Sequence, residues 1–442
     1  MTDLTQLTAS ELSNLYQSGA ASPVAVAQQV LAKIKRLNPV LNAFCFTDPE
    51  TTLKQAQASE LRWQQGQQLS LLDGVPVAVK DSILTQGWPT LHGSLAIDPD
   101  QPWLEDAPAV ARLREAGAVF VGKTTMPEFA WSIASTTSQA YGITVNPWNI
   151  KCSPGGSSGG SAVAVAGSLV PLAIGTDMGG SITVPGSFCG VFGYKPSSGK
   201  VAHSPRDALN LSTVGVFARS TVDLITTVNI ISSPDATDWF HIPSTKMQAN
   251  PDIQLNSLNV GLDAGIHSTV IHTVLQPVST LYQFDLQLAL EIFTNITLPV
   301  RLNQWQNLTQ EQQSVTEKHT QKIAILAHVK RDLYHWLTQR TKFGAAINQH
   351  INEFDVIIVP STNTSAADIS CDVGPINRDI SVWSQLCAVV GLPSITVPVG
   401  LDAQGLPVAV MIIGPMHGDE LVLQAAQAIE QQFPMPACPV IL

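Results

Sequence analysis

Charged residues are scarce in this sequence of 442 residues, and basic residues are scarcer than acidic ones. Charged residues make up 13% of the chain, whereas hydrophobic residues make up 45%. Disordered chains show the reverse balance, so this composition indicates a large buried core. With 23 basic and 34 acidic residues, the formal net charge is −11. Because nucleic-acid-binding proteins carry a basic face, we expect no nucleic-acid partner.

The sequence also lacks paired cysteines and long apolar runs. Its cysteines are scattered, with none in CxxC spacing, so we expect reduced thiols, no metal site and a cytoplasmic protein. The N-terminus lacks the basic and apolar regions of a signal peptide. The most apolar stretch, 162–174, is too short to span a membrane, so we expect no membrane association. The six cysteines are Cys45, Cys152, Cys189, Cys371, Cys387 and Cys438.

Helix-like and strand-like segments alternate along the chain. Residues 8–11, Thr-Ala-Ser-Glu, form a capping-box pattern that opens a helix, and Gly19 ends it. A second helix is expected to begin at Ser22 and to end at Pro39. Other helices are expected over 49–65, 108–116, a segment from 158, and 419–433, and strands over 75–79, 118–121, 170–175, 355–360, 394–399 and 408–413. This alternation predicts an α/β fold.

The region from about 235 to 350 is less regular and is rich in Gln, Asn and Thr. We expect two helices there, near 308–338 and 340–353. The sequence shows no internal repeat and no low-complexity linker. It therefore predicts one large domain over residues 1–442, with a variable insert at about 235–350.

Two segments place serine among glycines beside regular structure. They are 153–161, SPGGSSGGS, and 175–185, GTDMGGSITVP. Glycine permits positive φ and lets a ligand approach the main chain closely. Successive backbone N–H groups in such turns can converge on one point and bind an anion.

Three interpretations of the first segment remain open from its residues alone. A phosphate-binding loop is disfavoured because the GK[ST] of a Walker motif is missing. Residues 155–159 match G-x-S-x-G, which would make Ser157 an elbow nucleophile, but no histidine partner is marked out. A plain flexible turn is the third. Cys152 and Cys189 flank the glycine-rich segments, but small buried cysteines are common, so a thiol nucleophile is disfavoured.

The stretch GGSSGGSAVAVAGSLVPLAIGTDMGGSITVPGSFCGVFGYKP resembles the signature block of the amidase signature family. Further blocks resemble that family in the same order: LDGVPVAVKDSI, DAPAVARLREAGAVFVGKTTMPEFAW, YGITVNPWN and LCAVVGLPSITVPVGLDAQGLPVAVMIIG. Together they cover about half of the chain. The resemblance implies a single α/β domain with a mixed β-sheet covered by helices. It also implies an amidase that acts on linear amides without metal or organic cofactor.

Carried over position by position, the resemblance assigns a Ser-Ser-Lys triad. Ser181 would be the nucleophile, Ser157 the bridging serine that usually follows a cis peptide bond, and Lys80 the base. The oxyanion hole would use backbone N–H groups around Met178, Gly179, Gly180 and Ser181, and the supporting residues would be Asp177 and Ser158. The reaction implied is hydrolysis of a carboxamide through an acyl-enzyme on Ser181, releasing ammonia or an amine and a carboxylic acid.

The proposed chemistry requires a neutral lysine. A serine hydroxyl becomes an effective nucleophile only when a base removes its proton, and an ammonium cannot accept one. A free lysine has a pKa of about 10.4, and burial can lower it by up to ~3–5 units. The apolar residues VPVAV before Lys80 supply such surroundings. Strand alternation predicts that Asp81, next in the chain, points outward.

Family members often carry arginine two positions after the nucleophile, where this chain has Thr183. We therefore expect a neutral or apolar acyl group, in a pocket lined by the insert and by Phe129, Ala130, Trp131 and Ser132. Trp131 fits an ordinary core position equally well.

The expected partner is a small-molecule amide, and both monomer and homodimer remain open. The alternative is the amidase-like subunit of a glutamine-dependent tRNA amidotransferase complex. Against this alternative, the chain lacks the arginine- and tyrosine-rich stretch associated with that protein. A third possibility is a protein with the amidase signature fold that binds a ligand but has lost catalysis. The presence of all three triad residues disfavours it.

Overall fold

The computed structural model describes residues 3–243, 245–262, 284–329, 331–370 and 380–439. Its centre is a sheet of ten strands in the order β1-β3-β2-β6-β8-β7-β11-β12-β10-β9. Strand β2 pairs in parallel with β3 and β6, and β9 pairs in parallel with β10, whereas the other pairs are antiparallel. The strands are β1 (Phe44–Thr47), β2 (Pro76–Lys80), β3 (Val119–Thr124), β6 (Leu172–Asp177), β7 (Phe192–Lys195), β8 (Thr213–Ala218), β9 (Val260–Leu262), β10 (Val356–Pro360), β11 (Ser394–Leu401) and β12 (Pro407–Ile413). The predicted mixed sheet is confirmed.

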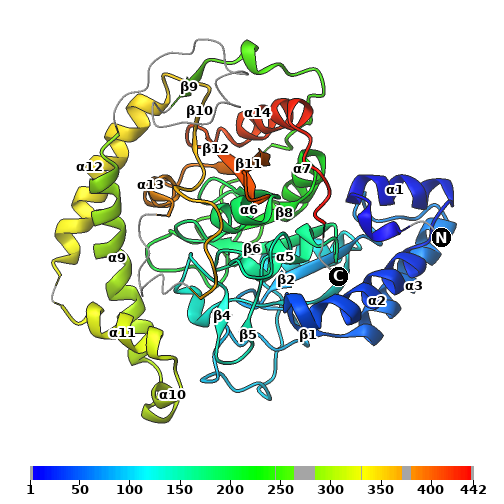
Figure 1. Cartoon of the computed structure of the whole chain (residues 1–442), viewed down its shortest axis with the longest axis horizontal. Coiled ribbons are helices and arrows are strands. Elements are labelled where there is room, and N and C mark those ends of the chain that lie inside the picture. The colour runs from blue at the N-terminus through cyan, green and yellow to red at the C-terminus, as the bar shows by residue number, and fades with distance from the viewer. Residues whose placement is uncertain (1–2, 244, 263–283, 330, 371–379, 440–442) are drawn as a thin grey trace.

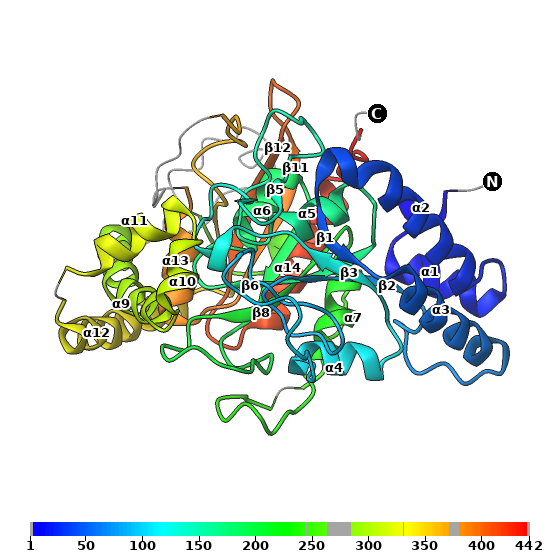
Figure 2. The same cartoon turned by 90° about the horizontal axis from the view of Figure 1, so that it is seen from below.

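Helices flank this sheet and extend beyond both of its ends (Figures 1 and 2). One group, α1 to α3, lies beside the β1 end, and another, α9 to α12, forms a helical lobe at the opposite side (Figure 1). The described helices are α1 (Ala9–Ser18), α2 (Pro23–Leu41), α3 (Pro49–Gln64), α4 (Pro108–Glu115), α5 (Gly159–Ala166), α6 (Thr183–Cys189), α7 (Thr221–Ile231), α9 (Leu286–Gln306), α10 (Gln310–Ser314), α11 (Lys318–Ala327), α12 (Leu333–Ile351), α13 (Val382–Val390) and α14 (Asp419–Gln432), with short 3₁₀ turns at Leu4–Gln6, Glu128–Ala130 and Leu255–Ser257. A small hairpin joins β4 (Thr137–Ser138) to β5 (Gly142–Ile143).

Helix α5 lies in the middle of the molecule because its residues are small. Every residue of Gly159–Ala166 is buried, as expected for a helix packed on all sides. A Cβ atom at Gly160 would lie 2.4 to 2.6 Å from atoms of Thr125, so only glycine permits this close approach. The helix packs against β2, β6 and α6 and so fixes the loop that precedes it.

The local signals at the N-terminus predict the structure well. Thr8 and Glu11 form the capping box of α1, and Gly19 ends the helix with a φ of 71°. Helix α2 begins after Ser22 but continues through Pro39 to Leu41 and ends at Asn42 with a φ of 50°. The predicted stop at Pro39 was wrong because proline in the last turn removes one backbone donor without preventing the remaining helical bonds.

The predicted helix at 308–338 was wrong. Helix α9 ends at Gln306, and Thr309 opens α10 with a new capping box, in which Gln312 is the reciprocal partner. Helices α11 and α12 then follow separately. The capping pattern explains the break, because a side chain that accepts the first free N–H groups starts a new helix. Helix α9 itself was not predicted.

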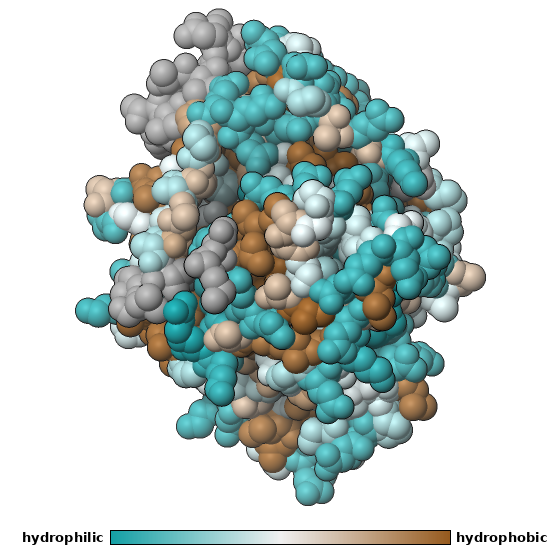
Figure 3. All heavy atoms as spheres, turned by 90° about the vertical axis from the view of Figure 1, so that its right-hand side faces the viewer, coloured by the Kyte–Doolittle hydropathy of each residue, from teal (hydrophilic) through white to brown (hydrophobic). Residues whose placement is uncertain are grey.

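The surface around α1 to α3 is mostly hydrophilic, with hydrophobic side chains in small groups (Figure 3). Within the described part of the chain, no helix combines the length and hydropathy needed to cross a membrane. The same residues contain no cluster of three or more His, Cys, Asp or Glu side chains that could hold a metal ion.

Candidate active site

Lys80 is the last residue of β2, and its side chain is fully buried. Its Nζ lies 2.6 Å from Ser157 Oγ, 2.9 Å from Thr176 Oγ1 and 3.4 Å from the Thr176 carbonyl oxygen. Strands β2 and β6 are parallel neighbours, so their carboxyl ends bring Lys80 and Thr176 together. The predicted pairing of Lys80 with Ser157 is therefore present in the structure.

Burial lowers the pKa of Lys80 to about 7, while the negative charges of Asp177 and Asp81 partly oppose that shift. The dominant cause is desolvation, which disfavours the ammonium form. A substantial fraction of Lys80 is thus neutral near neutral pH, which is the form that can accept a proton.

Asp81 does not point to solvent, contrary to the sequence-based expectation. Its carboxylate is buried and accepts hydrogen bonds from the N–H groups of Leu91 and Gly93 and from the Tyr141 hydroxyl at 2.9 to 3.1 Å. Burial raises the pKa of Asp81, whereas nearby Lys123 lowers it. The segments that carry Leu91 and Tyr141 cover its carboxylate.

Ser157 lies within the glycine-rich segment 153–161, just before α5 begins at Gly159, and follows a cis peptide bond from Gly156. A Cβ atom at Gly156 would approach the Ser135 carbonyl oxygen to 2.4 Å and the Ser132 carbonyl oxygen to 2.7 Å. Glycine is therefore required for the main chain to pass here. The next residue, Ser158, donates from Oγ to the Thr176 carbonyl at 3.2 Å and from its N–H to the Ser181 carbonyl at 3.2 Å. Ser158 thereby ties the loop to both ends of the 176–181 turn.

Ser181 follows β6 in a turn shaped by Asp177. The buried Asp177 carboxylate accepts the N–H of Gly180 at 2.9 Å and the N–H of Ile182 at 2.6 Å. Gly180 has a φ of 118°, which favours glycine. The N–H of Gly180 is thus engaged by Asp177 rather than directed at a ligand. Met178, Gly179 and Ser181 line the adjacent pocket.

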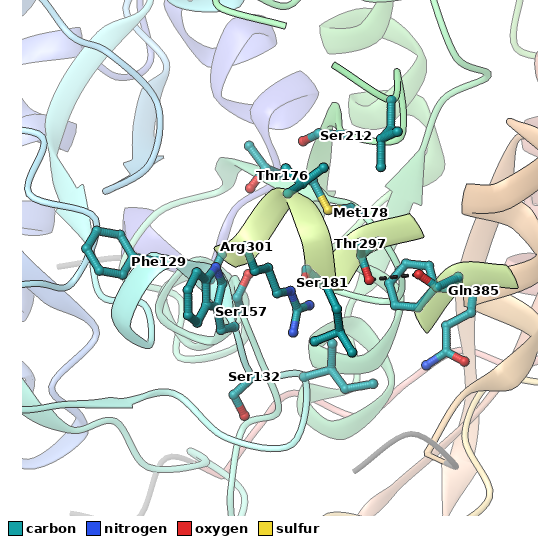
Figure 4. Close-up of a pocket in the computed structure, with 18 of the residues that line it drawn as sticks. Phe129, Ser132, Ser157, Thr176, Met178, Ser181, Ser212, Thr297, Arg301 and Gln385 are labelled. Atoms are coloured by element: carbon teal, nitrogen blue, oxygen red, sulfur yellow. Dashed lines mark hydrogen bonds between the residues drawn. The ribbon is translucent and has the colours of Figure 1, made fainter. Parts of the chain in front are cut away.

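Ser157 and Ser181 face the same pocket (Figure 4), and Ser181 is 6% exposed. Within the described residues, no hydrogen bond joins the two hydroxyl groups. The structure therefore contains the Lys80–Ser157 contact and the shared pocket, but not the Ser157–Ser181 contact that the relay requires. Catalytic hydrogen bonds often tighten only when a substrate binds.

The predicted substrate-binding residues 129–132 line this pocket together. Phe129 and Ala130 adopt positive φ values of 51° and 62°, which are uncommon for residues with a side chain. The Trp131 ring packs on Phe129, with ring centroids 5.8 Å apart. Trp131 is thus both a packed residue and part of the pocket wall, so the two interpretations of its sequence position are compatible.

Glu128 holds this loop against the helical lobe. Its buried carboxylate accepts hydrogen bonds from Ser94 Oγ at 2.6 Å, from the Glu317 N–H at 2.8 Å and from the Thr320 hydroxyl. Glu317 precedes α11, and Thr320 lies on it. The loop that forms one pocket wall is therefore fastened to residues inside the 235–350 region.

The opposite wall comes from residues that the sequence did not single out. Helix α9, whose labelled residues Thr297 and Arg301 appear in Figure 4, supplies most of it. No motif marked these residues, and the helical pattern of α9 was obscured by Pro299 within it. The added lining residues are Ile133, Thr176, Leu209, Ser212, Phe293, Thr294, Thr297, Leu298, Val300, Arg301, Gln304 and Gln385.

Neither cysteine near the glycine-rich segments lines the pocket. Burial raises the pKa of the Cys189 thiol well above its usual value, and burial also raises the pKa of Cys152. Both thiols are therefore poor sources of a thiolate nucleophile. Thr183 is fully buried, and its hydroxyl is hydrogen-bonded to Ser384 Oγ at 2.6 Å.

The comparisons with known proteins agree on one protein family. A sequence model of the amidase family matches residues 25–287 and 280–423. A subunit of the glutamyl-tRNA(Gln) amidotransferase of Nostoc sp. is 30% identical over 462 residues, which span 93% of this chain and 94% of that protein. The corresponding protein of Chloroflexus aggregans is also 30% identical, over 98% of this chain and 97% of that protein.

A solved structure with the same fold is that of peptide amidase from Stenotrophomonas maltophilia. Its TM-score is 0.84 at 26% sequence identity, and the match covers 98% of this chain and 99% of that one. The large mixed sheet and its flanking helices are shared along almost the full length of both chains.

Proposed function

This chain belongs to the amidase family, and from that premise we propose that it hydrolyses a carboxamide through an acyl-enzyme on Ser181. The products would be ammonia or an amine and a carboxylic acid. The observation that carries the proposal is the buried contact of 2.6 Å between Lys80 Nζ and Ser157 Oγ, at the pocket that Ser181 also lines.

The contacts of Lys80 suit a neutral amine that accepts a proton. A neutral amine has two N–H donors and one lone pair, whereas an ammonium has three donors. The two donors can be directed to the Thr176 hydroxyl and carbonyl oxygens, which leaves the lone pair facing Ser157. Ser157 then donates its proton to Lys80 and accepts the proton of Ser181. A hydroxyl can do both because it is a donor and an acceptor.

The reaction proceeds in two halves. The Ser181 oxygen attacks the amide carbonyl carbon, and its proton moves through Ser157 to Lys80. The same proton returns to the leaving nitrogen when the C–N bond breaks, which leaves an ester on Ser181. Water then attacks this ester, its proton takes the same path, and the Ser181 oxygen regains a proton as the acid leaves.

We assign the oxyanion donors to the turn after β6. Because Asp177 engages the N–H of Gly180, the proposed donors are the N–H groups of Gly179 and Ser181, with Met178 beside them. A Cβ atom at Gly179 would lie 2.5 Å from the Phe293 ring, so the helical lobe packs directly on this turn. Loss of one oxyanion donor typically costs about 2.7–4 kcal/mol of transition-state stabilisation.

The region 235–350 is proposed to shape the substrate pocket, since α9 forms one wall and the residues around α11 fasten the other. The proposed substrate is a linear small-molecule amide, and the proposed location is the cytoplasm, where the thiols of the chain would stay reduced. The oligomeric state stays open between monomer and homodimer.

A second candidate is favoured by the curated relatives. Two of them are subunits of a glutamyl-tRNA(Gln) amidotransferase. In such a role the same pocket would act within a multi-subunit complex instead of alone. Both candidate functions use the amide-hydrolysing site proposed here. They differ in whether the chain needs a partner protein for activity.

Ammonia release by the purified chain separates the two candidates. A panel of aliphatic, aromatic and peptide amides, together with glutamine, would be incubated with the chain alone and with a Ser181→Ala control. Turnover of at least one amide by the chain alone, absent in the control, supports the stand-alone amidase. Absence of turnover until a partner protein is added would support the role within a complex.

Asp177→Asn is predicted to lower kcat/KM by about 10- to 100-fold and to shift its pH dependence. An amide group would accept only one of the two N–H groups, and an unsatisfied buried donor costs about 1–3 kcal/mol. Asp177 also raises the pKa of Lys80, so its loss would move the acid limb of the profile to lower pH. The measurement is kcat/KM from pH 5 to 9.

Asp419→Asn is the matched control. The Asp419 carboxylate also accepts a backbone N–H, that of Ser197 at 2.9 Å, but it does not line the pocket. It should lower thermal stability without moving the pH midpoint. An unchanged midpoint in Asp177→Asn would contradict the electrostatic link between Asp177 and Lys80.

A further inference from the structure

Arg301 brings a positive charge into the pocket that Ser181 lines. It lies on α9, its side chain is half-buried, and its guanidinium group points into the pocket (Figure 4). The guanidinium carbon lies 5.9 Å from the centroid of the Trp131 ring, so the group is placed between the two pocket walls.

The described residues that line the pocket include no Asp, Glu or Lys, and Arg301 is the one charged side chain among them. This charge contrasts with the formal net charge of −11 for the whole chain. A cleft lined by one sign of charge attracts ligands of the opposite sign. The charge among these lining residues therefore favours an anionic group over a cationic one.

The position of Arg301 also suits a carboxylate geometrically. A guanidinium group can stack on an aromatic ring through its face while its edge donates paired N–H groups to a carboxylate. The other pocket residues near it on α9, Thr297 and Gln304, carry polar groups that can complete such a site. The helical lobe thus presents donors of the kind that bind a carboxylate.

We propose that the amidase acts on amides that carry a carboxylate group, and that Arg301 binds this carboxylate. The inference rests on the proposed amide hydrolysis and names its substrate class. It replaces the expectation of a neutral acyl group, which was based only on the threonine that stands at position 183 in place of arginine. Thr183 is buried and bonded to Ser384, so the cation in this chain is supplied by the helical lobe instead.

The test compares matched substrates in wild type, Arg301→Gln and Arg301→Lys. Monoamides of malonic, succinic, glutaric and adipic acid would be paired with alkyl amides of equal chain length. Wild type should prefer the carboxylate member of the best-fitting pair in kcat/KM. Arg301→Gln should lower kcat/KM for that substrate by roughly 10- to 100-fold, as expected for a lost charge-assisted hydrogen bond. The loss in kcat/KM for the alkyl amide of equal chain length should be at least tenfold smaller. Arg301→Lys should retain part of the preference, because it keeps the charge but not the planar fork.

Lys322→Gln provides the charge-matched control. Lys322 lies on α11, is exposed, and does not line the pocket, so its removal changes the net charge without changing the site. The carboxylate preference should persist in this variant. Equal losses for both substrate series in Arg301→Gln, or a wild-type preference for the alkyl amides, would overturn the inference and make Arg301 a structural residue.

A binding measurement separates this inference from the proposed function. Calorimetric titration of Ser181→Ala with succinate and glutarate should show binding that Arg301→Gln in the same background loses. If anions bind in this way but no amide is hydrolysed by wild type, the proposed function fails and the anion site remains. If amides are hydrolysed without carboxylate preference, only the substrate class is wrong.

Discussion

Ser181→Ala is expected to lower kcat by at least four orders of magnitude while the protein stays folded. Removing the hydroxyl takes away the atom that bonds to the acyl group, and loss of a nucleophile in a serine hydrolase has effects of about 10⁶-fold. The side chain is small and, within the described residues, makes no hydrogen bond that the fold requires. The measurement is turnover of an amide identified in the substrate screen, with thermal unfolding recorded in parallel.

Ser212→Ala is the matched control for this prediction. Ser212 lines the same pocket, but among the described residues its hydroxyl makes no hydrogen bond to Lys80, Ser157 or Ser181. Its loss should change kcat by no more than several-fold. Turnover in Ser181→Ala close to that of wild type would refute the assignment of the nucleophile, whichever residue performed the chemistry.

Lys80→Ala is expected to be nearly as damaging, with a loss of about 10³- to 10⁴-fold in kcat at pH 7. Ser157 would lose the group that accepts its proton, and the proposed path for the proton of Ser181 would be broken. Hydroxide can partly replace the amine, so the remaining activity should rise continuously with pH. The measurement is kcat/KM of the variant from pH 6 to 10.

Wild type should show a different pH dependence. Since the pKa of Lys80 is lowered to about 7, the neutral amine is the minor form below that pH and the major form above it. The value of kcat/KM should therefore rise through pH 7 and level off above it. A profile that falls as pH rises through 7 would contradict a neutral lysine as the base.

The Lys123→Met variant tests whether the pH dependence of activity belongs to Lys80 or to a second buried lysine. The pKa of Lys123 is also lowered, to about 8, by burial, but its Nζ contacts the Ile83 carbonyl oxygen and the Thr90 hydroxyl instead of the pocket. This variant should lose stability yet keep a pH midpoint near 7. Lys123 interacts with Asp81, whose charge raises the pKa of Lys80, so a small shift of the midpoint is compatible with Lys80 as the base. Loss of the rise in kcat/KM near pH 7 in the folded variant would show that Lys80 is not the group that titrates.

The sequence predicted the parts of the molecule whose form depends on local chemistry. The β-branched run before Lys80 predicted a buried strand, and the capping box at Thr8 predicted the start of α1. The small residues after Ser158 predicted a helix buried on all sides. In each case the side chains near in sequence decide the structure, either by periodicity or by satisfying backbone N–H groups.

Features that depend on distant segments were not predictable in the same way. Asp81 is buried because the segments that carry Leu91 and Tyr141, 10 and 60 residues farther along the chain, cover it, which strand alternation cannot reveal. The engagement of the Gly180 N–H by Asp177 depends on the three-dimensional form of the turn. Arg301 joins the pocket only because α9 packs opposite the 129–132 loop, more than 100 residues away in the chain.

The central claim is that Ser181 becomes covalently acylated through the Lys80–Ser157 contact. The most direct test is mass spectrometry of the protein quenched by acid during turnover of a slowly released acyl substrate, followed by peptide mapping. We predict an added mass equal to the acyl group on the peptide that contains Ser181, absent in Ser181→Ala and greatly reduced in Lys80→Ala. Acylation of Ser157 or of a cysteine, with Ser181 unmodified, would contradict the account.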